Sequence, residues 1–146
     1  MVFSDKHLNA RKQALSLLKQ AAEAGHTGAQ LRLAMYELLG EGLDNDKEAG
    51  VNLVKQAAEK GDVRAERLLS HLYYQGLGVP MNAAQGKYWL EKAASNGHTE
   101  AASLVREWQQ AEMLMQTRQQ EQSSLKRYQI LLGVVAVVAL LLIVLL

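Results

Sequence analysis

The feature that most restricts the fold of this chain is an internal repeat with a period of 36 residues. In each copy, a pair of alanines is followed by a glycine. The three copies are Ala21, Ala22 and Gly25, then Ala57, Ala58 and Gly61, then Ala93, Ala94 and Gly97. A unit of this length cannot bury its apolar face alone, so neighbouring units must stack against one another. The sequence therefore predicts a series of repeated units that pack against one another.

Each unit contains two predicted helices separated by glycines. After Gly61, apolar residues recur at spacings of three and four, which predicts a helix that ends at Gly76. Asn82 caps the second predicted helix, and Gly97 ends it. Further predicted caps are Asp46, one unit earlier, and the capping-box pair Thr27 and Gln30. Because the chain has one proline and few consecutive β-branched residues outside its tail, the expected fold class is all-α, with a helix-turn-helix pair in each unit.

The C-terminal segment 130–146 is the most apolar part of the chain. Its seventeen residues, ILLGVVAVVALLLIVLL, contain no polar side chain and reach the lower limit for a helix that spans hydrocarbon. A helix docked on a small domain keeps a polar face, whereas this segment is apolar on every face. A fully buried central helix is the alternative, but the charges stop abruptly at Arg127, as they do beside a membrane. We therefore expect a single C-terminal transmembrane helix.

Basic residues beside this segment predict its orientation. Lys126 and Arg127 precede the span, with Tyr128 at headgroup depth, and the bias of basic residues places that side in the cytoplasm. The N-terminus has no apolar stretch of the kind that a signal peptide contains. These features predict a tail-anchored, single-pass membrane protein with a cytoplasmic N-terminal domain, and the bacterial inner membrane is the expected location.

The best-formed unit, residues 65–101, carries a recognisable set of residues. They are Ala65, Leu69, Tyr73, Gly76, Gly78, Val79, Asn82, Trp89, Ala93, Ala94, Gly97 and Ala101. On these residues the chain resembles the Sel-one-like repeat, a relative of the tetratricopeptide repeat. The preceding unit fits less well, because Glu37 replaces the expected tyrosine, Gly50 an alanine and Leu53 an aromatic residue. The resemblance implies a helical solenoid that binds proteins, and it implies no reaction.

The repeat and the tail together predict the domain organisation. Residues 5–105 are expected to form the solenoid, with full units at about 29–64 and 65–100 and half units at each end. Residues 106–129 form a polar helical linker, and residues 130–146 form the tail anchor. The linker carries a degraded heptad at Leu104, Trp108, Ala111, Met115, Arg118, Gln122 and Leu125. These positions are too polar for a stable coiled coil, so only weak homo-oligomerisation is expected.

Residues that could support catalysis or hold a cofactor are few. The chain has no cysteine, which excludes a disulfide framework, a thiolate zinc site and a cysteine nucleophile. Its four histidines form no metal-binding motif, and two of them, His26 and His98, are repeat equivalents at predicted helix starts. A formal net charge of +1 gives no electrostatic basis for nucleic-acid binding. We expect no enzymatic activity, cofactor, metal, nucleic acid or small-molecule substrate.

The first helix of each unit carries more apolar and aromatic side chains outside the repeat signature than a solvated face requires. First helices line the concave surface of helix-pair solenoids, and arginine and tyrosine are enriched in protein interfaces. The candidate partner-binding residues are therefore Arg32, Met35, Arg67, His71 and Tyr74. The alternative is that apolar side chains on these helices only fill the packing between helices, and it applies to Leu31, Leu38, Leu39 and Leu68.

Two functions fit these expectations. The favoured one is a membrane-tethered scaffold or adaptor that recruits or docks a cytoplasmic protein partner, as part of an envelope, secretion or motility assembly. The alternative is an inhibitor or immunity-type protein that binds one specific protein and blocks it, a role that some similar repeat proteins in bacteria play. A tight stoichiometric complex that abolishes the partner's activity would favour the alternative.

Overall fold

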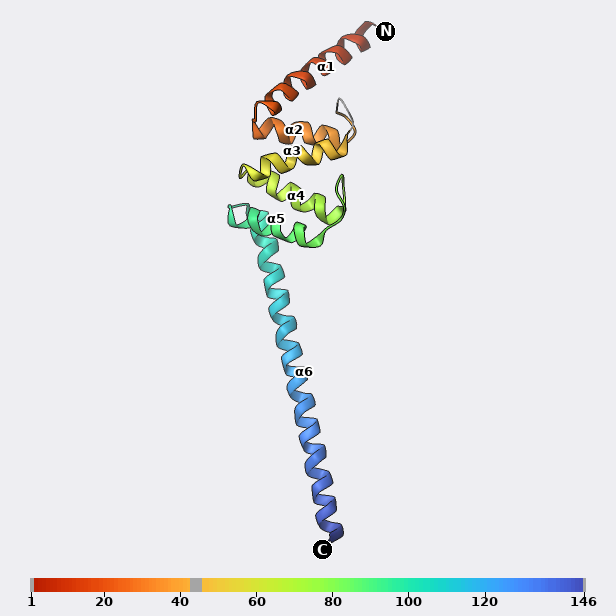
Figure 1. Cartoon of the computed structure of the whole chain (residues 1–146), viewed down its shortest axis with the longest axis vertical. Helices are drawn as coiled ribbons and strands as arrows, with labels where there is room; N and C mark the ends of the chain where they lie inside the picture. Colours follow the sequence, from red (N-terminus) through yellow and green to blue (C-terminus); the bar gives the residue numbers. More distant parts are fainter. Residues whose placement is uncertain (1, 43–45, 146) are drawn as a thin grey trace. The chain divides into compact units, whose positions relative to one another are not determined.

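The computed structural model describes residues 2–42 and 46–145, which form six α-helices and no strand (Figure 1). In chain order they are α1 (Val2–Glu23), α2 (Thr27–Leu38), α3 (Lys47–Glu59), α4 (Val63–Gln75), α5 (Ala83–Ser95) and α6 (Thr99–Leu145). The prediction of an all-helical repeat is therefore confirmed. The chain divides into two compact units, Met1–Val105 and Arg106–Leu146.

Helices α1 to α5 of the first unit pack in chain order, each against the next (Figure 1). The main core lies where α2, α3 and α4 meet. It contains Ala34, Leu38, Val51, Val54, Ala57, Ala58, Ala65, Leu69 and Leu72. A second cluster joins α5 to the first turn of α6 through Leu90, Ala93 and Ala101. Ala57, Ala58 and Ala93 are fully buried, because neighbouring helices approach one another at these small side chains.

The repeated glycines end their helices in the left-handed conformation. Gly25, Gly61 and Gly97 have φ values of 91°, 84° and 95°, which glycine adopts without the steric cost of a Cβ. In the first copy, the backbone N–H of His26 donates to the Ala21 carbonyl at 3.2 Å and that of Gly25 to Ala22 at 3.0 Å. This pair of bonds is the Schellman motif. The same two bonds recur after α3 and α5, which explains why the alanine pair and the glycine repeat together.

The helix starts match the sequence predictions at two of three positions. Asp46 accepts hydrogen bonds from the backbone N–H groups of Glu48 and Ala49, and Asn82 accepts one from Gln85. The predicted capping box at Thr27 and Gln30 is wrong. The N-cap of α2 is His26, which makes no side-chain cap bond. The amide of Gln30 is instead 2% exposed and donates to Ala22 O at 3.2 Å and to Gln56 Oε1 at 3.0 Å. The Gln30 side chain therefore bonds to residues of α1 and α3 and does not cap the start of its own helix.

The second unit consists of the part of α6 that follows Val105. Within it, the polar stretch 106–129 and the apolar stretch 130–145 belong to the same unbroken helix, and all the side chains described are exposed. The helix is long and apolar enough to cross a membrane, and none of its apolar stretch is buried. The alternative of a buried central helix is therefore not what the structure has. Leu146, at the end of the predicted span, lies outside the described residues.

Candidate protein-binding surface

The exposed side of α2 carries two of the five predicted contact residues. Arg32 and Met35 are exposed and lie one turn apart, in a groove of about 370 Å³ that reaches Arg64 on α4. Met35 is 44% exposed and Leu39, at the end of the same groove, is 67% exposed. Neither side chain is needed to fill the core. The groove therefore combines exposed apolar side chains with cationic side chains.

The other three predicted residues lie on α4 in different environments. His71 is exposed. The guanidinium of Arg67 pairs with Glu100 on α6 at 3.3 Å, and its side chain is 23% exposed. The ring of Tyr74 lies against Gly86 of α5, where an added Cβ would come within 2.9 Å of the ring. Burial raises the pKa of Tyr74. Arg67 and Tyr74 thus also serve the packing of α4 on its neighbours.

The four leucines for which core packing was the alternative to partner binding differ in their burial. Leu38 is buried in the core, and Leu31 and Leu68 pack against the core while remaining partly exposed. Leu39 is the exception, because it lines the groove and is mostly exposed. Three of the four leucines therefore hold the helices together, and one is available to a partner.

The two arginines of the groove differ in their charge environment. Arg64 donates two hydrogen bonds to the carboxylate of Asp62, the N-cap of α4, at 3.1 and 2.8 Å. The Arg64 guanidinium, followed by a hydrogen bond from Thr27, holds the pKa of Asp62 at about 2. Within residues 2–42 and 46–145, Arg32 has no ion pair. Its charge is therefore the more available of the two.

Two buried carboxylates form hydrogen bonds between successive parts of the repeat unit. The sequence analysis did not predict that either would be buried. Glu66 is fully buried and accepts hydrogen bonds from Asn96 Nδ2 at 2.8 and 3.0 Å, with Lys92 Nζ 3.8 Å away. Glu37 is 4% exposed, and its carboxylate accepts the backbone N–H of Asp46 at 3.0 Å. For Glu37 the repeat gave one indication of burial, because the equivalent position in the next unit is the aromatic Tyr73. In the described part of the chain, no group of three or more His, Asp or Glu residues could hold a metal ion.

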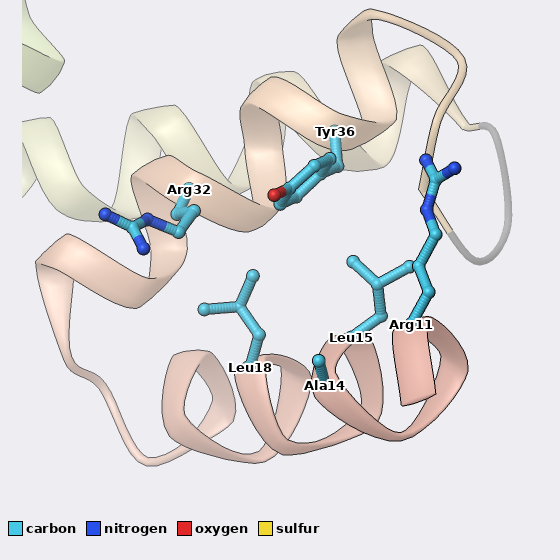
Figure 2. A pocket seen from close by; sticks show the side chains of 6 residues that line it. All are labelled: Arg11, Ala14, Leu15, Leu18, Arg32 and Tyr36. Atoms are coloured by element: carbon cyan, nitrogen blue, oxygen red, sulfur yellow. The ribbon is translucent and has the colours of Figure 1, made fainter. Parts of the chain in front are cut away.

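A separate pocket of about 220 Å³ lies between α1 and α2 (Figure 2). Its floor is formed by Ala14, Leu15 and Leu18 of α1, and Tyr36 of α2 lies across from them. Arg11 and Arg32 stand on opposite sides of the opening. Arg11 Nη2 donates to the backbone carbonyl of Glu41 at 3.1 Å and lies 3.4 Å from Glu41 Oε2. Sequence reasoning missed this pocket.

The helix pairs coincide with matches to a known repeat. The Sel1 repeat matches residues 27–62 and 63–98 in full and residues 9–26 in part. The chain belongs to the Sel1 repeat family. Sel1 repeat proteins generally mediate protein–protein interactions and are generally non-enzymatic. In this Sel1 repeat chain, the full matches correspond to the pairs α2–α3 and α4–α5, and the partial match falls on the C-terminal part of α1.

Two solved structures resemble the chain. A Sel1 repeat protein from Oxalobacter formigenes is 33% identical over 62% of this chain, with a TM-score of 0.56. The protein c5321, a protective antigen of uropathogenic Escherichia coli that displays the SLR fold, is 38% identical over 60% of this chain, with a TM-score of 0.57. The matched parts span 26% and 19% of those two chains. A comparison with curated proteins found no match.

Proposed function

We propose that this Sel1 repeat protein is a membrane-tethered scaffold that recruits or docks a cytoplasmic protein at the membrane. The observation that carries the proposal is the combination, in one chain, of protein-binding repeats with an unburied apolar helix that follows a pair of basic residues. Holding a partner at the membrane raises its effective concentration there without any chemical step. Envelope, secretion and motility assemblies of bacteria are the settings in which such a tether would act.

Three features support the tether. The stretch 130–145 is apolar on every face, and an α-helix satisfies its own backbone hydrogen bonds in hydrocarbon. Lys126 and Arg127 precede it, which favours a cytoplasmic repeat unit and a tail anchored in the bacterial inner membrane.

A charge placed in the span tests the tether. Ala139→Arg, near mid-span, should cost about 2.5 to 3.5 kcal/mol in the free energy of membrane insertion. Ala139→Leu is the matched control. Carbonate extraction of membranes should release only the arginine variant, and retention of both would contradict a spanning helix.

The proposed partner-binding face consists of Arg32, Met35, Arg67, His71 and Tyr74. Arg67 and Tyr74 have packing roles, so the sharper test uses Met35 and His71, whose side chains are exposed. Met35→Glu combined with His71→Glu should reduce partner capture at least about tenfold, because two desolvated carboxylates would enter the interface.

The matched control for this test adds the same two charges elsewhere. Ala84→Glu combined with Gln85→Glu places them at the exposed start of α5, where the helix dipole favours them. The measurement is the amount of each partner retrieved with the full chain from gentle detergent extracts. Equal retrieval by both double variants would exclude this face. Inhibition of the retrieved partner in a stoichiometric complex would favour the inhibitor function instead.

A further inference from the structure

The pocket between α1 and α2 occupies a place that is filled in the next repeat. Ala14, Leu15 and Leu18 of α1 precede by 36 residues three core positions of α3, of which Val51 and Val54 are fully buried. By the same period, Tyr36 on the other wall corresponds to the buried Leu72. The floor and one wall of the pocket are therefore core positions of the repeat.

The interior repeats show what covers these positions. On α3 the cover is α2, and a Cβ added at Gly50 would lie 3.2 Å from both Ala34 O and Leu38 Cγ. On α5 the cover is α4, whose Tyr74 ring lies on Gly86 and whose Ser70 Oγ donates to the Gly86 carbonyl at 2.8 Å. In both cases a first helix presents a small residue and, one turn later, a large one.

The corresponding face of α1 has no such cover within residues 2–42 and 46–145. Ala14, the equivalent of Gly50 and Gly86, is exposed. Leu17 is 59% exposed, whereas its equivalent Leu53 is packed against the core. Ala14 is small enough to admit a closely packed helix. Leu15 is 6% exposed, so this face of α1, called the seat below, is only partly covered by the described residues.

We propose that this seat, lined by Ala14, Leu15, Leu18 and Tyr36, binds an acidic amphipathic helix of a partner protein. The helix lies on α1 as α2 lies on α3, and one of its large apolar side chains enters the pocket. A volume of about 220 Å³ suits a single side chain and is smaller than the cavities that hold drug-sized ligands. The inference rests on the proposed scaffold function and names the class of partner.

The charges around the seat select an acidic helix. Arg32 stands at the rim where the interior repeat has the apolar Leu68, and Arg11 on the other side is 54% exposed despite its contact with Glu41. Helix α1 as a whole carries four basic and two acidic residues. Carboxylates on the incoming helix would lie near these cations, which favours encounter and correct register.

Helix α1 of a second copy carries the same excess of basic residues and would be repelled from the seat, and its other helices are no better suited. Its α2 and α4 already cover α3 and α5. The exposed part of its α6 has Arg106 at the position where α2 has Ala34 and α4 has Ser70. A long charged side chain there prevents the close approach that the small residue allows. A helix of a partner protein is therefore a better occupant of the seat than a second copy.

The test uses helix-stabilised peptides built on residues 27–38, the sequence of α2. The acidic probe carries Arg32→Glu and Met35→Glu, and the basic probe carries Arg32→Lys and Met35→Lys. Binding of the labelled peptides to the full chain in detergent micelles is followed by fluorescence anisotropy at low salt. The acidic probe should bind at least about tenfold more tightly than the basic probe. Adding Leu38→Ala to the acidic probe should weaken its binding at least about tenfold, because the pocket loses its occupant.

Variants of the protein locate the binding. Ala14→Trp fills the seat from an exposed position and should abolish binding of the acidic probe, and Ala84→Trp on the exposed surface of α5 is the matched control. Circular dichroism checks that both variants keep their helical content. Absence of binding by the acidic probe, equal binding by the two probes, or equal affinity for both tryptophan variants would overturn the proposal. A dimer of the unliganded chain that Ala14→Trp dissociates would assign the seat to a second copy and overturn it as well.

This experiment separates the seat from the wider scaffold function. Partner capture that is lost with Met35→Glu and His71→Glu but kept with Ala14→Trp would leave the scaffold intact and refute the seat. Probe binding that depends on Ala14, together with failure of the face variants to change partner capture, would support the seat and exclude the other face.

Discussion

The two compact units of this protein are both helical, but their helices are defined by different physical means. In the repeat unit, every turn between helices is marked by specific residues, such as the glycines with positive φ at Gly25, Gly61 and Gly97. In the second unit, the helix runs unbroken through Gly133, and no described side chain is buried. Helix ends in the repeats therefore depend on caps and packing, whereas the tail helix has no buried side chain, which fits the membrane location that we propose for it.

Removing the tail should have the largest effect of any change. A chain that ends at Arg127 should move entirely from the membrane fraction to the soluble fraction and keep the helical signal of the repeats, because the core lies within Met1–Val105. Fractionation and circular dichroism measure the two outcomes. Aggregation or unfolding of the shortened chain would mean that the two units depend on each other.

A larger side chain at a repeat contact should destabilise the first unit alone. Ala58 is fully buried, so Ala58→Leu should overpack the contact and cost about 1 to 3 kcal/mol in the free energy of unfolding. Gln109→Leu, on the exposed part of α6, is the matched control and should leave the melting temperature unchanged. Thermal melts of the full chain in detergent decide between them. Equal melting of the two variants would contradict close packing at the alanines.

The same substitution of glycine should have opposite consequences in the two units. Gly97 has φ of 95° and no neighbour within 4 Å of an added Cβ, so Gly97→Ala should cost about 1 kcal/mol through backbone strain alone. Gly133 lies within α6 and also has no close neighbour, so Gly133→Ala should be neutral or slightly stabilising. Chemical denaturation followed by circular dichroism measures both. A loss of stability at Gly133 would show that its face contacts another helix.

One helix cap in the repeat unit should be sensitive to acid, whereas the tail should not. The pKa of Asp62 is lowered from 3.8 to about 2 by its hydrogen bond with Arg64. Stability from this carboxylate is therefore present above pH 3.8 and is lost as the pH falls through about 2. Asp62→Asn keeps the cap but removes the titration, so its unfolding free energy should fall less between these two pH values. An identical pH profile for the parent and the variant would contradict the prediction.

Most of the fold could be predicted from the sequence, because the signals that define it are local. The alanine pair and the glycine lie within one helix end, and the Schellman bonds join residues three and five positions apart. Caps such as Asp46 and Asn82 bond to residues two or three positions away. The prediction at Thr27 and Gln30 failed for the opposite reason, since Gln30 bonds to Gln56, 26 positions along the chain.

The candidate surface could be predicted only in part. Arg32, Met35 and His71 are exposed, as a binding face requires, but spacing alone did not reveal that Tyr74 lies on Gly86. The sequence did contain an indication of this contact, because glycine occurs at the equivalent positions Gly50 and Gly86, where another helix lies close to the backbone. Recognising that neighbour required the relative placement of α4 and α5. Sequence spacing within one helix does not contain that information.

The sequence by itself determined the 36-residue period, the helix pairs, the family and the unbroken apolar stretch at the C-terminus. Each of these depends on residues close together in the chain or on composition over one turn after another. Only the tertiary structure decided that Glu66 is buried against Asn96, that Tyr74 packs against Gly86, and that no helix among the described residues covers Ala14 on α1. These properties depend on which side chains meet across a helix interface, and that is settled only when the helices pack.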